Sequence, residues 1–240
     1  MPILGTVASS NKVFSPLSLS NLAGWWDPSD ASSVTLSSGR VSQLNDLSAN
    51  GRHMVQATSA QQPTYTTAGR NGLNVMTFNG IENMSPSATM SSTYLTMMIV
   101  VKNDFSNRTA TSWTNEQLNL QNNDTSNDIW DFQLGTGGSN FYHWADGAKN
   151  DSWHYFSITR PLTGTSPTAT VDAGGSWSNT REAGNTIPAL STGKLQIGRR
   201  TTDNGQPLYG KIGEVILYTD IKDATDIGKL NTYLAAKWGF

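Results

Sequence analysis

Three observations predict an all-β fold built as a sandwich of two antiparallel sheets. Short runs rich in β-branched and aromatic residues recur between clusters of Gly, Asn, Ser and Asp. Helical periodicity is scarce before residue 220, so the predicted strands follow one another without intervening helices. Only the last twenty residues carry a helical pattern. Strands in such an order pair antiparallel and bury one face against a second sheet, as in a jelly roll.

Eight segments carry the strand pattern. In the segment WHYFSIT, alternate residues fall on opposite faces, so His154, Phe156 and Ile158 share one face and the residues between them share the other. One of these faces is predicted to look into a core. The eight predicted strands are residues 74–78, 94–102, 130–134, 140–144, 153–159, 168–171, 194–198 and 211–218.

The C-terminal segment is predicted to be one amphipathic helix. Asp220 or Asp223 can cap its start, and Gly239 supplies a stop. The helix is predicted to cover the outside of a sheet or the rim between the sheets. Burying its apolar stripe would contribute on the order of 6 to 10 kcal/mol before entropy. The stripe consists of Ile227, Leu230, Leu234 and Trp238.

Two regions are predicted along the chain: an extended N-terminal arm, residues 1–19, and one sandwich domain, residues 20–240. The arm carries a single charge, Lys12, and several apolar residues without a regular period. We therefore expect contact to order it, either with its own sandwich or, as we favour, with a neighbouring subunit or particle surface. In that interface Phe14 and Leu17 are predicted to fill pockets.

Composition excludes several classes of partner. The 16 basic and 18 acidic residues are scattered singly, so no footprint for a phosphate backbone is visible and nucleic acid is not expected as a partner. No segment approaches the roughly 18 apolar residues of a membrane span, and the N-terminus lacks the pattern of a secretory signal. The absence of cysteine favours assembly in a reducing cytosol.

Blocks at both ends of the predicted domain resemble a known family. The opening block reads LAGWWDPSDASSVTLSSGRVSQLNDLSANGRHMVQAT, followed by QPTYTTAGRNGLNVMTFNG; later blocks read WHYFSITR, LQIGRR and YGKIGEVILYTDIKDATDIGKLNTYLAAKWGF. Together they resemble laminin-G-like, concanavalin A-like domains, which are common in tailed-phage structural proteins and bacterial surface proteins. The resemblance implies a two-sheet jelly roll with ligand loops on one edge or on a concave face. It implies no single activity, because such domains include lectins, adhesion modules, glycan hydrolases and virion decorations.

No catalytic residue is predicted. The hydrolases of this fold use a Glu-x-Asp-x-Glu strand, but none of the four glutamates has another acid two residues away. Asp128 and Asp131 are three residues apart, which places them on opposite faces of a strand. None of the three histidines lies near a nucleophile elbow, and His154 is predicted to be a hydrogen-bonded residue on the inward face. The glutamates are Glu82, Glu116, Glu182 and Glu214, and the other histidines are His53 and His143.

No resident cofactor is predicted, and the alternative is a bound calcium ion. Oxygen ligands recur at every second position in one Asn/Asp-rich stretch. The glycine and terminal glutamate of a calcium-binding EF loop are missing, and such stretches are also ordinary turn material. The candidate ligands are Asn122, Asp124, Ser126 and Asp128.

The eight tryptophans divide into two groups. Those in family-like or periodic positions are predicted to be buried: Trp25, Trp26, Trp153 and Trp238. Those near polar loops are candidates for stacking against a sugar: Trp113, Trp130, Trp144 and Trp177. Arg199 and Arg200 follow a predicted strand, where they either grip a carboxylate of a neighbouring subunit or form a solvated strand end.

The leading hypothesis is a non-enzymatic structural protein of a tailed-phage virion, made in the host cytoplasm: a capsid decoration, head-fibre or tail-associated subunit. Its partners would be other virion proteins and further copies of itself. The alternative is a soluble lectin or adhesin that binds host-surface glycan. A glycan hydrolase is the third hypothesis, which the missing acid pair disfavours.

Overall fold

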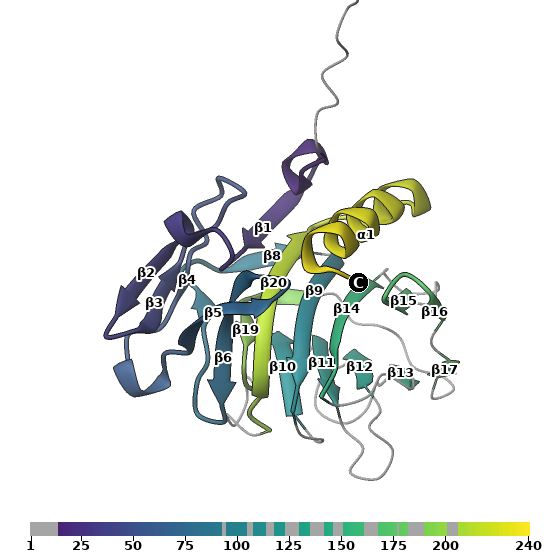
Figure 1. Cartoon of the computed structure of the whole chain (residues 1–240). Coiled ribbons are helices and arrows are strands. Elements are labelled where there is room, and N and C mark those ends of the chain that lie inside the picture. Colours follow the sequence, from purple (N-terminus) through teal and green to yellow (C-terminus); the bar gives the residue numbers. More distant parts are fainter. Residues whose placement is uncertain are drawn as a thin grey trace, which may run out of the picture.

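The structure is a computed structural model in which two β-sheets pack face to face and one helix covers the outer side of the larger sheet (Figure 1). This confirms the predicted all-β sandwich of antiparallel sheets with a C-terminal helix. The described residues are 14–92, 95–104, 108–113, 118–122, 130–134, 142–145, 151–160, 168–176, 178–181, 190–200 and 206–240.

The large sheet contains twelve of the described strands. Strand β1 (Leu22–Trp26) lies beside β20, and β2 (Val34–Ser37) lies beside β3. The remaining order is β16 (Gly175–Ser176), β15 (Thr168–Val171), β14 (Trp153–Arg160), β9 (Leu95–Asn103), β20 (Tyr209–Tyr218), β6 (Leu73–Asn79), β5 (Thr64–Arg70), β3 (Arg40–Leu44), β4 (Met54–Val55) and β7 (Ser85–Pro86).

The small sheet and two strand pairs complete the described β structure. An isolated bridge between Met84 and Ile197 joins the two sheets. Three short 3-10 helices lie in connections: η1 (Pro16–Ser18), η2 (Ala31–Ser33) and η3 (Ser59–Gln61). The small sheet has the order β12 (Trp130–Leu134), β11 (Leu118–Asn122), β10 (Arg108–Trp113) and β19 (Leu195–Ile197), and the pairs are β13 (Tyr142–Ala145) with β17 (Ser178–Arg181) and β18 (Leu190–Gly193) with β8 (Met90–Ser92). The eight predicted strands overlap β6, β9, β12, β13, β14, β15, β19 and β20, in that order.

Strand β9 shows why the large sheet has two buried faces. Its sequence LTMMIVVKN is apolar almost without interruption. Met97, Ile99 and Val101 belong to the core between the sheets, whereas Met98 and Val100 belong to a second core under the helix. A strand that is covered on both sides loses the usual alternation of apolar and polar residues. The same holds for β14, where both faces of the WHYFSIT segment contribute to a core.

Helix α1 (Ala224–Trp238) ends where the sequence predicted. Asp223 is the N-cap, and its carboxylate accepts a hydrogen bond from the backbone N–H of Asp226. Gly239 adopts a left-handed conformation at the C-cap, which glycine tolerates without steric cost. Asp220, the other predicted cap, instead pairs with Lys222.

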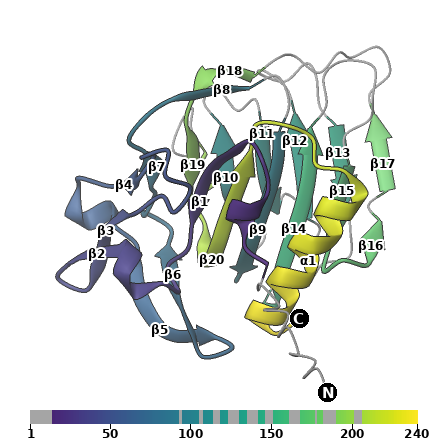
Figure 2. The ribbon, with the colours of Figure 1, turned by 90° about the horizontal axis from the view of Figure 1, so that it is seen from above.

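The apolar stripe of α1 packs on the outer face of the large sheet, as Figure 2 shows from above. Leu230, Leu234 and Trp238 are buried, and Ile227 is partly buried. They contact the outward residues of β9, β14 and β20, including Val100, Tyr155 and Ile216. The helix therefore covers a second core on the outer face of the large sheet and does not lie on the rim between the sheets.

A β-bulge in β20 decides which side chains face the helix. Ile212 pairs with Val101, and Glu214 pairs with the adjacent Val100, so Gly213 is an extra residue in the strand. Ile212 therefore faces the core between the sheets, while Glu214 faces α1. A methyl group on Gly213 would lie 2.9 Å from the indole of Trp238, so the glycine also makes room for that ring.

The end of the predicted arm is packed against the domain. The ring of Phe14 lies edge-on to Tyr233 of α1, and Leu19 also packs against the helix-side core. Pro16 is buried, and its carbonyl accepts a hydrogen bond of 3.0 Å from the hydroxyl of Tyr218. Leu17 is 56% exposed. Residues 14–19 thus contact their own sandwich, and residues 1–13 lie outside the described residues.

Candidate functional site

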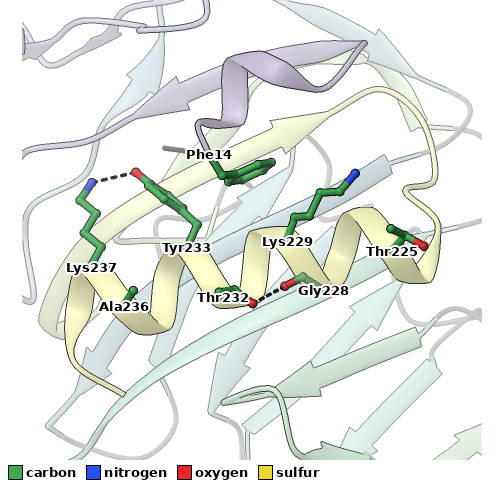
Figure 3. Close-up of a pocket in the computed structure, with 8 residues that line it drawn as sticks. All are labelled: Phe14, Thr225, Gly228, Lys229, Thr232, Tyr233, Ala236 and Lys237. Carbon is green, nitrogen blue, oxygen red and sulfur yellow. Dashed lines mark hydrogen bonds between the residues drawn. The ribbon is translucent and has the colours of Figure 1, made fainter. Parts of the chain in front are cut away.

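The outer face of α1 forms one wall of an open groove of about 840 Å³ (Figure 3). The groove runs beside the helix, and Phe14 closes one side of it. Its lining is mainly apolar, with two lysines and two threonines along the helix. The lining residues are Phe14, Thr225, Gly228, Lys229, Thr232, Tyr233, Ala236 and Lys237.

The shape of the groove follows from the sequence of α1. Gly228, Thr232 and Ala236 follow one another at intervals of four residues, so these small or short side chains lie in a row along one face of the helix. A methyl group on Gly228 would meet no atom within 4 Å, so this position is open space. The edge-on contact between Phe14 and Tyr233 has a centroid distance of 6.1 Å, which is typical of a stable aromatic pair.

A cluster of buried charges lies directly under the groove and shares Tyr233 and Lys237 with it. The Nζ atom of Lys237 contacts Oδ2 of Asp27 and lies 2.9 Å from Oε2 of Glu214. The side chains of Glu214 and Asp27 are 0% and 6% exposed, and that of Lys237 is 18% exposed. We refer to Asp27, Glu214 and Lys237 as the charge cluster.

Aromatic side chains complete the surroundings of Glu214. Its Oε1 atom accepts hydrogen bonds from Nε1 of Trp25 at 2.7 Å and from the Tyr233 hydroxyl at 2.8 Å. Its Oε2 atom accepts a hydrogen bond of 2.8 Å from Nε1 of Trp238, besides the one from Lys237. Both carboxylate oxygens therefore have two donors each, which offsets much of the cost of burying the group.

The surroundings raise the pKa of Glu214 and that of the adjacent Tyr233 hydroxyl. Burial raises the pKa of Glu214, the Asp27 carboxylate raises it further, and the Lys237 ammonium and the Trp238 indole oppose both effects. Burial also raises the pKa of the Tyr233 hydroxyl, and the adjacent Glu214 carboxylate acts in the same direction. The hydroxyl therefore stays protonated and remains a hydrogen-bond donor.

This arrangement is suited to anchoring and is poorly suited to hydrolysis. A glycosidase needs one carboxylic acid and one carboxylate that both reach the same sugar bond. Here Lys237 lies between the two acids, and α1 covers Glu214 completely. The cluster instead connects three distant segments: the end of β1, the middle of β20 and the last turn of α1.

Sequence reasoning did not find the charge cluster, although one signal for it exists. Glu214 stands in the run GEVILY, where every neighbour is apolar or glycine, and a lone acid in a buried strand requires a partner. The partners come from segments far away, since Lys237 and Asp27 are 210 residues apart in the sequence. No local sequence pattern therefore predicts that Asp27 and Lys237 are the partners of Glu214.

The side chains of the four candidate sugar-binding tryptophans lie outside the described residues, so their exposure stays a prediction. Their backbone register is partly described. Trp113 on β10 pairs with Leu195. Trp130 begins β12. Trp144 on β13 pairs with Asn179, and its neighbour Ala145 pairs with Ser178, the residue that follows Trp177.

The predicted calcium ligands also fall largely outside the described residues. Asn122 ends β11, whereas Asp124, Ser126 and Asp128 lie in the undescribed residues 123–129. Among the residues whose side chains are described, no three His, Asp or Glu side chains lie close enough together to hold a metal ion. The calcium alternative stays a prediction.

His154 and Arg199 make local contacts. Nδ1 of His154 lies 2.8 Å from Oδ2 of Asp172, whose other oxygen accepts a hydrogen bond from the backbone N–H of Tyr155. His154 is thus hydrogen-bonded, as predicted, at a partly buried position beside Phe156. The guanidinium of Arg199 donates to the Ile81 carbonyl at 3.4 Å. This contact lies within the chain, and a partner carboxylate for Arg199 stays a prediction.

Solved structures with similar folds include binding domains of toxins and a domain of a glycan-cleaving enzyme. The binding domain of Paraclostridial Mosquitocidal Protein 1 has a TM-score of 0.62 at 10% identity, over 92% of this chain and 53% of that one. The ligand binding domain of botulinum neurotoxin serotype D, in complex with N-acetylneuraminic acid, has a TM-score of 0.59 at 8% identity, over 91% and 53%. Domain 4 of AbnA, an extracellular GH43 arabinanase from Geobacillus stearothermophilus, in complex with arabinotriose, has a TM-score of 0.55 at 12% identity, over 88% and 98%.

These comparisons define the class of fold: a lectin-like β-sandwich. The identities are low, so the likeness extends to the fold and not to a particular ligand. No family model matches the chain, and no curated protein matches it. Within the described part of the chain, no helix combines the length and the apolar character that crossing a bilayer requires.

Proposed function

We propose that the chain is a non-catalytic, lectin-like binding domain whose ligand is a glycan. The observation that carries this proposal is the two-sheet sandwich, which it shares with domains whose structures hold arabinotriose and N-acetylneuraminic acid. Ligands of such sandwiches bind to loops and sheet faces that a rigid scaffold positions. The indoles near polar loops supply the flat apolar surface on which a sugar ring stacks.

Trp144 and Trp177 are the pair we assign first to the glycan. The pairing of Ala145 with Ser178 brings the backbone next to Trp144 and the residue that follows Trp177 to the same end of the β13–β17 pair. A glycan array with the full chain, followed by calorimetry on the best glycan, tests the assignment. We expect Trp144→Ala and Trp177→Ala to weaken binding about tenfold or more, which is about 1.4 kcal/mol. The control Leu36→Ala, at an exposed residue of β2, should leave the affinity unchanged.

The outcomes separate the ligand class from the site. Absence of binding to any glycan on the array would overturn the proposal. Glycan binding that is unchanged in both tryptophan variants would support the glycan as ligand and would show that Trp144 and Trp177 do not form its site. Where an alanine variant misfolds by circular dichroism, Trp144→Phe and Trp177→Phe keep an aromatic ring and should lose less affinity.

The absence of catalysis is part of the same proposal. Among the described residues, the buried acids Asp27 and Glu214 both contact Lys237, and the side chain of Glu214 is fully buried. We therefore expect no release of reducing ends from a broad panel of polysaccharides. Release that disappears on Asp128→Asn or Asp131→Asn would overturn this expectation, since these acids belong to the region whose side chains are not described.

A second candidate function is a structural role in a tailed-phage virion, as a capsid decoration, head-fibre or tail-associated subunit. The observation that favours it is the position of Phe14, to which residues 1–13 are joined, beside an apolar groove on the outer layer. A chain shortened by residues 1–13 should stay folded, because the contacts of residues 14–19 are retained. Under this hypothesis the shortened chain loses oligomer formation or particle attachment, which sedimentation and a particle-binding assay measure. Unchanged assembly would argue against it.

A further inference from the structure

The groove on α1 leaves the side chains of Phe14 and Tyr233 partly exposed, with the exposed Ala236 beside them. Tyr233, Ala236 and the backbone at Gly228 form its floor, and Phe14 stands at its edge (Figure 3). A short apolar segment that lies in this groove would remove its apolar side chains from water, which is favourable. What covers the groove has to be apolar, and it has to reach the outer face of α1.

Residues 1–13 begin at the groove itself, because the next residue, Phe14, lines it. The helix length from Thr225 to Lys237 is about 18 Å. Thirteen residues span up to about 43 Å when extended, so roughly half of the segment is enough to follow the groove. A segment that is tethered at the rim has an effective concentration in the millimolar range, which favours it over a free partner.

The chemistry of the two surfaces agrees. Residues 1–13 read MPILGTVASSNKV, with apolar side chains at Ile3, Leu4 and Val7 and no acidic residue. The lysines of the groove are already paired, Lys229 with Asp226 and Lys237 with the acids of the charge cluster. An acidic ligand would therefore gain little from these lysines, whereas an apolar segment with small residues fits against Gly228 and Ala236.

We propose that residues 1–13 dock in cis in the groove on the outer face of α1 of the same chain. Burial of the apolar side chains of residues 1–13 against Tyr233 and Phe14 stabilises the contact. Gly228 has no side chain, so the segment can approach the helix backbone closely there. This inference is independent of the proposed glycan ligand, and it competes with the second candidate function, in which residues 1–13 contact another subunit or a particle. A second copy of the chain that supplies the segment, or a foreign partner in the groove, would be a different outcome of the tests below.

Limited trypsin digestion tests the docking, because Lys12 is the sole Lys or Arg in residues 1–13. Intact-mass measurement follows the loss of residues 1–12 with time. We expect Gly228→Trp, which fills the groove, to speed cleavage at Lys12 about tenfold, since docked segments resist proteolysis. Ala224→Trp places the same side chain on the same helix at an exposed position that does not line the groove. This control should be cleaved at the wild-type rate.

Equal cleavage rates for Gly228→Trp and wild type would overturn the proposal. The same holds if wild type is cleaved at Lys12 as fast as a free peptide of residues 1–19. Circular dichroism of α1 confirms that each variant is folded before digestion.

Disulfide trapping provides a second test that does not depend on filling the groove. The chain contains no cysteine, so an introduced pair reports a single contact. Cysteines that replace Ile3, Leu4 or Val7, one at a time, are combined with Ala236→Cys in the groove. We expect at least one combination to oxidise within one chain, whereas Ser37→Cys, an exposed position on β2, should not trap any of them.

The products of oxidation decide between cis and trans. A faster-migrating monomer on a non-reducing gel supports the proposal. Covalent dimers that form with Ala236→Cys and not with Ser37→Cys would assign the segment to a second copy and overturn docking in cis. No trapping with any of the three positions would overturn docking of residues 1–13 altogether.

Discussion

The two layers on either side of the large sheet are built differently. Between the sheets, the described core consists of aliphatic, Met and Phe side chains from both sheets, together with the buried Trp26. Under α1, the core mixes aliphatic residues with Trp238, Tyr155 and Tyr233, and it holds a carboxylate with no exposure. The hydrophobic cluster of the first layer is mainly non-directional packing, although the indole of Trp26 donates to the Arg52 carbonyl. The second layer places a fully hydrogen-bonded carboxylate among its apolar side chains.

The difference shows what each layer specifies. Apolar packing tolerates changes of shape as long as volume is kept. A buried carboxylate requires its donors at defined positions, so the charge cluster sets where the last turn of α1 lies on the sheet. Lys237 in this turn, and Tyr233 one turn before it, also line the groove. The contacts that hold α1 on the sheet and the surface of the groove thus share residues of the same helix. The following substitutions test how much these contacts contribute to stability.

The largest effect is expected for Trp238→Ala. The indole is fully buried, stacks on Trp153 with a centroid distance of 6.5 Å and donates to Glu214. Removing it should lower the free energy of unfolding by about 3 to 5 kcal/mol, as large-to-small core changes do. Denaturant titration measures the loss. A loss below about 1 kcal/mol would mean that the helix layer contributes little to stability.

A slightly smaller loss is expected for Lys237→Met, which keeps the aliphatic stem and removes the ammonium. Asp27 and Glu214 would then face each other without a cation, at a cost of about 3 kcal/mol. Combining it with Glu214→Gln should recover part of this cost, because one of the two negative charges is removed. Strictly additive losses in the double variant, measured by urea unfolding, would show that the cluster is not coupled.

Gly213→Ala should cost about 2 kcal/mol by overpacking. The new methyl group would lie 2.9 Å from the Trp238 ring and 3.0 Å from Val100 on the neighbouring strand. Thermal unfolding of the variant checks the loss. In the background Trp238→Phe, whose ring is smaller, the same change should cost less; an equal cost in both backgrounds would place the strain in the backbone of the bulge.

The smallest effect concerns pH. Because burial raises the pKa of Glu214 above its ordinary value of about 4.3, the native state binds more protons than the unfolded state just above that pH. The stability of wild type relative to Glu214→Gln should therefore fall as pH rises from 4 through the raised pKa. Urea titrations at a series of pH values measure this difference. A difference that grows with pH would mean that Lys237 and the indoles hold the carboxylate ionised more strongly than burial disfavours it.

Local signals in the sequence were sufficient for the fold class and for the helix. The aromatic and β-branched run WHYFSIT predicted β14, and the cap at Asp223 and the stop at Gly239 each depend on residues within one turn. The short strands before residue 70, such as VTLS and RVSQL, were missed. Their Ser and Thr content resembles that of turns, and pairing with neighbouring strands, not intrinsic propensity, forms them.

The charge cluster and the groove depended on contacts between distant segments. Glu214 faces α1 because the bulge at Gly213 shifts the alternation of β20 by one residue, and β1 brings Trp25 beside it through pairing with Ile216. Phe14 was predicted to bind a pocket on another subunit, and in this structure it lies on Tyr233 of its own chain. A periodic pattern fixes which residues share a face within one element. Strand register and chain packing decide which faces meet, since that choice depends on the summed burial of segments more than 180 residues apart.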